Sequence, residues 1–175
     1  SNVYVEGYQT TRGDMGTPPL LQASGISTFV LIDMSGLLLA MMKNVNVDGA
    51  SLTSSKGFRS TGAGVFYKCK AINCTNNAFQ SNGVTAVAIF CSATGCTTQP
   101  AFNGINCFGC VAFSNTVTGF TTSLSSKWTI DKCISYANSG GSSDGFHANS
   151  NQIQATNCVA YGNGRDGFRM QNGVS

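Results

Sequence analysis

The segment Cys158-Val-Ala-Tyr-Gly-Asn163-Gly-Arg-Asp-Gly-Phe168 indicates a repeat, because close copies of it occur earlier in the chain. Cys133-Ile-Ser-Tyr-Ala-Asn138 is followed by Gly145-Phe146, and Cys110-Val-Ala-Phe-Ser-Asn115 is followed by Gly119-Phe120. A motif that returns every twenty-odd residues is typical of one structural unit stacked on copies of itself. The sequence therefore predicts a repeat protein.

Aligning the chain on the phenylalanine of this motif extends the repeat to six copies. The intervals between successive copies are 21, 23, 18, 26 and 22 residues. The aligned phenylalanines each follow Gly or Ala, and they are Phe58, Phe79, Phe102, Phe120, Phe146 and Phe168. Upstream of all but the first lies a cysteine, namely Cys69, Cys91, Cys110, Cys133 or Cys158. Five residues after that cysteine comes Cys74, Cys96, Asn115, Asn138 or Asn163.

The repeat length and the composition of the copies predict the fold class. A period near 22 residues suits either a leucine-rich repeat or a coil of a β-helix. The Leu-x-x-Leu-x-Leu signature is absent, no window has sustained helical periodicity, and Gly and Asn punctuate short runs. We therefore predict an all-β fold, a right-handed single-stranded parallel β-helix of about six coils of ~22 residues. Residues 21–175 are expected to form this solenoid as part of a longer chain, and residues 1–20 an extended N-terminal arm or linker.

The repeated residues have expected places inside such a coil. The cysteine and the small residue two places on share one strand face, and we expect both to point inward. The phenylalanines are expected to stack, the asparagines to form an amide ladder in a left-handed corner, and the Gly before each Phe to have a positive φ. The eight cysteines are interpreted as small buried fillers. Cys107-Phe-Gly-Cys110 has the spacing of a metal site, but without a second such pair no zinc is predicted.

The coil at residues 157–168 resembles those of the right-handed parallel β-helix superfamily. Its members include the pectate-lyase-like fold, glycoside hydrolases of the polygalacturonase type and phage tailspikes, and the resemblance covers about residues 44–175. It implies the fold, and it implies a polysaccharide groove along one sheet face. Because these families share coils and differ in their sites, the function must be argued from the outward residues.

A polar strip is expected along one outer face of the solenoid. In each coil its first member is the residue that follows the Phe, and its second is the next residue that points outward. Next outward come Thr61, Asn82, Ile105, Ser123, Asn149 and Gln171. Amides, hydroxyls and guanidinium groups suit sugar hydroxyls and carboxylates. The alternative is an ordinary solvated face. The residues predicted to bind a polysaccharide are Arg59, Gln80, Asn103, Thr121, His147, Asn149, Arg169 and Gln171.

A candidate catalytic cluster lies at the last two copies. Asp144 and Asp166 both stand two places before the Phe, so stacking would separate them by about 5 Å. Such a pair could share a proton or act as acid and nucleophile in a retaining glycosidase. With His147 and Arg169 they partly resemble the polygalacturonase-type cluster, although the Gly-His-Gly and paired Asp-Asp motifs are missing. No cofactor is predicted, and two carboxylates alone would make a weak calcium site.

An outward apolar stripe is expected from the parity of the strands that follow each cysteine. It comprises Ile72, Thr94, Phe113, Tyr136 and Tyr161, with Val111, Ile134 and Val159. Three interpretations remain open: contact with another copy, as in trimeric tailspikes, stacking of sugar rings, or reversed parity that makes these residues core. We expect a covered surface, because a large exposed apolar patch marks an interaction site. The predicted assembly is a homo-oligomer, a trimer.

Charge and hydropathy exclude two kinds of partner. A net charge of +3 with 10% charged residues does not suit nucleic acid. The most apolar stretch, residues 28–42, is interrupted and too short to span a membrane. The prediction is a carbohydrate-recognising adhesin of an extracellular or virion surface, tailspike-like or tail-fibre-like. The alternatives are a polysaccharide-degrading glycoside hydrolase or lyase and a structural rod, with the incomplete catalytic set favouring a protein that is not an enzyme.

Overall fold

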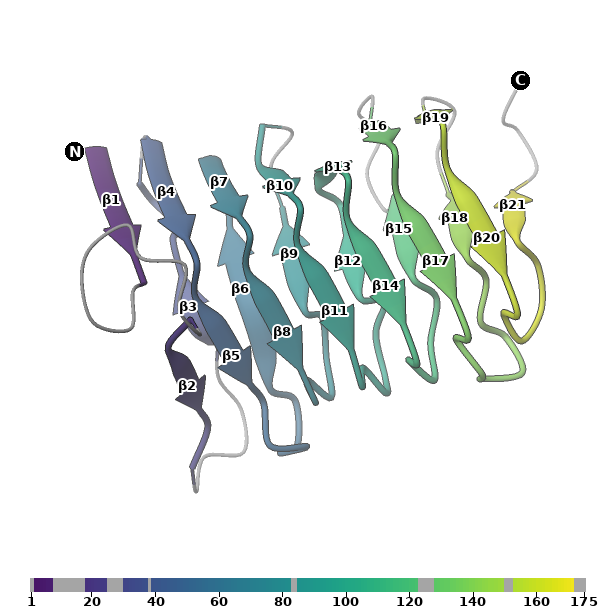
Figure 1. Cartoon of the computed structure of the whole chain (residues 1–175), viewed down its shortest axis with the longest axis horizontal. Helices are drawn as coiled ribbons and strands as arrows, with labels where there is room; N and C mark the ends of the chain where they lie inside the picture. The colour runs from purple at the N-terminus through teal and green to yellow at the C-terminus, as the bar shows by residue number, and fades with distance from the viewer. Residues whose placement is uncertain are drawn as a thin grey trace.

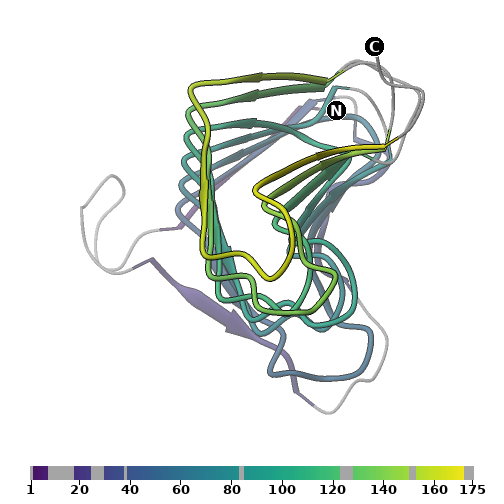
Figure 2. The ribbon, with the colours of Figure 1, turned by 90° about the vertical axis from the view of Figure 1, so that its right-hand side faces the viewer.

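Short strands follow one another along the chain, and parallel pairing gathers them into three sheets (Figure 1). The computed structural model describes residues 2–7, 18–24, 30–37, 39–82, 85–122, 128–149 and 153–171. Every third strand belongs to the same sheet, so each turn of the chain adds one strand to each of three seven-stranded sheets. Figure 2, turned by 90°, shows successive coils superimposed.

We call the sheets A, B and C in the order in which a coil visits them. Sheet A contains β1 (Asn2–Glu6), β4 (Leu39–Lys43), β7 (Ala63–Tyr67), β10 (Val87–Ile89), β13 (Asn106–Phe108), β16 (Trp128–Asp131) and β19 (Ile153–Thr156). Sheet B contains β2 (Leu20–Gln22), β5 (Asn46–Asp48), β8 (Lys70–Ile72), β11 (Ser92–Thr94), β14 (Val111–Phe113), β17 (Ile134–Tyr136) and β20 (Val159–Tyr161). Sheet C contains β3 (Val30–Asp33), β6 (Lys56–Ser60), β9 (Phe79–Ser81), β12 (Phe102–Asn103), β15 (Phe120–Thr122), β18 (Phe146–Ala148) and β21 (Phe168–Met170).

This arrangement confirms the predicted all-β parallel solenoid of about six turns. The turns average about 24 residues, slightly longer than the ~22 expected from the phenylalanine spacing. Within the expected N-terminal arm, β1 is paired with β4 in sheet A, and residues 8–17 lie outside the described part of the chain. The division at residue 20 stays a prediction.

The core of the rod is a set of side-chain ladders that run along its axis. All six aligned phenylalanines stack face to face, with ring centroids 4.7–4.8 Å apart and interplanar angles of 3–11°. The predicted cysteine ladder also points inward, and all eight cysteines are free thiols. A narrow core filled by rings and small side chains at a constant spacing holds each coil in register with the next.

The predicted asparagine ladder is present at the edge of this core. Asn115 Nδ2 donates to Asn138 Oδ1 at 2.8 Å, and Asn138 Nδ2 donates to Asn163 Oδ1 at 2.8 Å. The backbone N–H groups of Asn115 and Asn138 donate to the same two oxygens. These amides therefore satisfy buried backbone donors where the chain leaves sheet B, which a free-standing turn would leave to water.

Both predictions about backbone conformation at the corners are wrong. The left-handed residues lie one place before the cysteine, as at Lys68 (φ 51°), and one place before the asparagine, as at Ala137 (φ 53°). The glycines before Phe have no positive φ. Gly145 is instead required by close approach, because a Cβ there would lie 2.5 Å from the carbonyl oxygen of Gly167 in the next coil.

Candidate functional site

The outer face of sheet C carries a single row of polar side chains. Pairing of successive strands aligns six residues in one register: Arg59, Gln80, Asn103, Thr121, His147 and Arg169. We call this set the sheet C row. The side chains are partly exposed except for Thr121, which is 8% exposed. The structure thus brings together the residues that follow each Phe, as the repeat predicts.

Neighbouring groups hold several members of the sheet C row in place. Arg59 Nη2 forms an ion pair with Asp33 Oδ2, and this hydrogen bond lowers the pKa of Asp33 to about 2. Lys56 Nζ donates to Gln80 Oε1 at 3.0 Å. The hydroxyl of Thr121 donates to the carbonyl of His147 at 3.3 Å. The row is therefore preorganised, which reduces the entropy lost when a ligand binds.

Only some residues of the second set that was expected to point outward do so. Asn149 and Gln171, both predicted to bind substrate, are exposed just beyond β18 and β21. Ile105 is not outward, since it is 4% exposed and packs in the core. Gly104, with φ 62°, breaks the alternation directly after β12, so the next side chain turns inward. Ser123 lies outside the described residues.

Asp144 is the centre of the candidate catalytic cluster, and it is fully buried. Arg165 donates two hydrogen bonds to its carboxylate, from Nε to Oδ1 at 2.7 Å and from Nη2 to Oδ2 at 2.6 Å. The Nδ1 atom of His147 lies 3.5 Å from Oδ2, and Nη1 of Arg169 lies 4.0 Å from it. Three of the four predicted catalytic residues therefore meet around one carboxylate.

Asp166 completes the predicted set but has a different environment. Its backbone N–H donates to Asp144 Oδ1 at 3.4 Å, while its own side chain is half exposed. Arg165 Nε lies 3.8 Å from Asp166 Oδ2, so one guanidinium contacts both carboxylates. The two carboxylates are therefore linked through Arg165.

Burial and charge set the protonation of this cluster. Burial raises the pKa of Asp144, but the hydrogen bonds and charge of Arg165 outweigh it, and the pKa lies below its usual range. Burial lowers the pKa of His147, and the charges of Arg169 and Arg165 lower it further against the opposing effect of Asp144. At neutral pH the cluster therefore contains an ionised Asp144 beside a neutral imidazole.

Arg165 belongs to this cluster but was not predicted as a site residue from the sequence. It stands three places before Phe168, where the two preceding coils have Ser143 and Val117, so the repeat gave it no common role. Its backbone N–H donates to the carbonyl of Ser143, which places its side chain directly over the coil containing Asp144. The sequence feature that indicates this contact is a cationic residue in the turn of one coil when the coil before it has an aspartate at a buried position.

The apolar stripe on sheet B faces outward, which excludes reversed parity. Val159 is 50% exposed and Tyr161 is 55% exposed. Phe113 and Tyr136 stack with centroids 5.3 Å apart, and Tyr136 and Tyr161 at 5.1 Å. Because these rings cover one another's faces, the inner rings present edges and not faces to a ligand. Stacking of a sugar ring on them is thereby disfavoured.

Sheet A continues this apolar surface, and sequence reasoning did not find that part. Its outward residues in the earlier coils are partly exposed and in register. We call the combined surface the apolar band. It contains Met41, Val65, Tyr67, Val87, Ile89 and Phe108 on sheet A, and Val111, Phe113, Ile134, Tyr136, Val159 and Tyr161 on sheet B.

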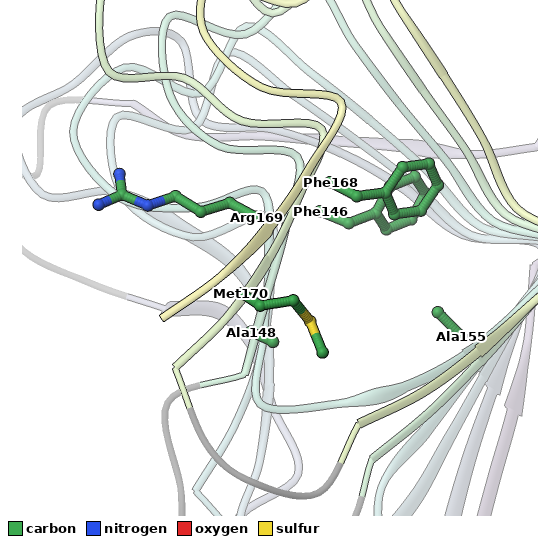
Figure 3. Close-up of a pocket in the computed structure, with 6 residues that line it drawn as sticks. All are labelled: Phe146, Ala148, Ala155, Phe168, Arg169 and Met170. Carbon is green, nitrogen blue, oxygen red and sulfur yellow. The ribbon is translucent and has the colours of Figure 1, made fainter. Parts of the chain in front are cut away.

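An apolar pocket lies at the C-terminal end of the core (Figure 3). Phe146, Ala148, Phe168 and Met170 contribute to its lining, and Phe168 and Met170 are 53% and 59% exposed. Figure 3 shows the guanidinium of Arg169 pointing away from the two rings. The pocket adjoins the last two described rings of the phenylalanine ladder, and its lining offers no group for acid–base chemistry.

Comparison of the chain with protein-family models, curated proteins and solved structures found no match. None of the described residues form a helix long and apolar enough to cross a membrane. Within the same ranges, no three His, Cys, Asp or Glu side chains gather as they would around a metal ion.

Proposed function

We propose that the chain recognises a carbohydrate through the outer face of sheet C. The observation that carries this proposal is the sheet C row, in which amide, hydroxyl, imidazole and guanidinium groups repeat along the rod in one register. Adjacent strands place such groups about 4.8 Å apart, close to the length of one sugar residue. A linear glycan lying along the axis would meet a polar side chain from each coil.

The environment of Asp144 supports recognition over hydrolysis. A retaining or inverting glycosidase needs one carboxyl group that carries a proton near neutral pH. Asp144 is fully buried, accepts two hydrogen bonds from Arg165 and has a lowered pKa. The carboxylate thus fixes the position of Arg165, whose side chain is 33% exposed and can donate to a ligand. No cofactor is required for this role.

The apolar band supports an assembly of several copies. It occupies sheets A and B, while the sheet C row lies on the remaining face, so copies joined through the band would leave the row accessible. We propose a homo-oligomer, a trimer, on an extracellular or virion surface, as in an adhesin. Sedimentation should detect a trimer that Tyr136→Glu dissociates, and a monomer over the micromolar range would contradict this part.

A glycan array tests the binding proposal directly. Wild-type protein should bind a defined set of glycans, and Arg169→Ala should reduce that binding by about tenfold, equivalent to 1.4 kcal/mol. Lys70→Ala is a matched control, because Lys70 is an exposed cation on sheet B away from the row. A structural rod would show no binding above background for any glycan.

A further inference from the structure

One loop of the solenoid is longer than its counterparts in the neighbouring coils. Six residues, 139–144, separate Asn138 from Gly145, whereas three residues separate Asn115 from Gly119. The following coil again has three residues at this place, 164–166. An insertion in a solenoid projects from one edge of the stack, and such loops often form the binding face. The three extra residues therefore build a feature that the repeat itself does not contain.

The longer loop borders a hollow of about 240 Å³. Residues 140–143 form one wall, and the turns of the two preceding coils form the other. Pro100 and Val117 provide apolar surface within it. Five hydroxyl side chains line the rest, namely Thr98, Thr116, Thr118, Ser142 and Ser143, and no charged side chain contributes. The hollow is smaller than the roughly 300 Å³ at which pockets for drug-sized ligands begin.

The hydroxyls of the hollow have defined orientations. Ser143 Oγ donates to the carbonyl of Thr116 at 2.9 Å, and Thr116 Oγ1 donates to the carbonyl of Thr97 at 3.2 Å. Thr118 Oγ1 accepts from the backbone N–H of Asp144 at 3.3 Å, which leaves its hydrogen to donate. A hydroxyl that has donated its hydrogen keeps lone pairs as acceptors. These three hydroxyls thus offer mainly lone pairs beside the apolar surface of Pro100 and Val117.

We propose that this hollow binds one uncharged sugar residue of the recognised glycan. A sugar ring has C–H groups that can pack on Pro100 and Val117. Its hydroxyls can donate to the hydroxyl oxygens that line the hollow. The absence of a cation among the lining residues gives an acidic sugar no partner here, whereas Arg169 provides one in the sheet C row. Thr118 stands three residues before Thr121, so one glycan can reach both places. The inference rests on the proposed carbohydrate recognition.

Deletion of residues 140–142 tests the inference, because it restores the three-residue spacing of the adjacent coils. The probe is saturation-transfer NMR with glucose, galactose, mannose and N-acetylglucosamine. Wild-type protein should give a signal with at least one of them, and the deletion should reduce it by about tenfold or more. Gly141→Trp should do the same by filling the hollow, since a Cβ at Gly141 meets no atom within 4 Å. Gly141→Ala is the matched control and should keep the signal.

Two results would overturn the inference. One is the absence of a signal from all four sugars with wild-type protein, and the other is an equal signal from wild type and Gly141→Trp. If glycans from the array bind wild type and Gly141→Trp equally but lose affinity with Arg169→Ala, the hollow is unused and the sheet C proposal stands. If no glycan binds the wild type, both proposals fail.

Discussion

At the scale of single residues, the most constrained group is the carboxylate of Asp144. It is fully buried, yet it accepts hydrogen bonds from Arg165 through both oxygens. A buried charge is tolerated only when it is paired and hydrogen-bonded, so removal of its partner is expensive. Arg165 is therefore expected to stabilise the fold as well as the outer face of sheet C.

Replacing Arg165 with Gln should lower the free energy of unfolding by about 2 kcal/mol, the cost of losing hydrogen bonds to a charged group. Urea denaturation at pH 7 would measure the change. Arg169→Gln is the control, since Arg169 lies 4.0 Å from the same carboxylate and makes no hydrogen bond to it within that distance. Equal losses in the two variants would show that general charge, and not the two-point contact, stabilises Asp144.

The stability of the protein should fall as the pH is lowered. The pKa values of Asp33 and Asp144 are depressed in the folded state, so the unfolded chain binds more protons in acid. Their contribution is complete above the ordinary value of 3.8 and is lost below it, down to about 2 for Asp33. The lowered pKa of His147 acts in the same direction below 6.5. Denaturation midpoints at several pH values would check this, and a midpoint that rises between pH 7 and 4 would contradict it.

At the scale of strands and ladders, stacking depends on neighbours on both sides. Phe102 is buried and stacks on Phe79 and Phe120, so Phe102→Ala should lower the free energy of unfolding by about 3–5 kcal/mol. Phe168 is half exposed and stacks on Phe146, and its truncation should cost roughly 1 kcal/mol because less area is buried. Thermal denaturation of the two variants compares the same residue type in the same ladder. Similar losses would mean that the coils do not act as a continuous stack.

The ladders were predictable from the sequence, because Phe returns in six copies of the repeat, Cys in five and Asn in three, and repetition reveals their common environment. Ile105 and Arg165 were not predictable in this way. Ile105 points inward because Gly104 has a positive φ, and Arg165 acts on a residue 21 positions earlier in the chain. The alternation of side chains between the two faces of a strand predicts the face of a residue only within that strand. Contacts made by turns depend on loop lengths, and those vary from coil to coil.

At the scale of the whole molecule, the outer face of sheet C differs in chemistry from the outer faces of sheets A and B. Sheet C presents the polar row, whereas sheets A and B together present the apolar band. Ile134, Val159 and Tyr161 are the most exposed members of the band, and large exposed apolar patches mark interaction sites. This separation of polar and apolar surfaces is what the proposed assembly of several copies requires, because it leaves the sheet C row accessible.

Calorimetric titration with the glycan that binds most tightly on the array would measure whether carbohydrate binds along the sheet C row, as proposed. Asn103→Ala and Arg169→Ala alter β12 and β21, which are separated in the sheet by β15 and β18. Each variant should weaken binding by about tenfold, whereas Lys70→Ala on sheet B should leave the dissociation constant unchanged. Unchanged affinity in both sheet C variants, or a loss confined to Lys70→Ala, would contradict the account.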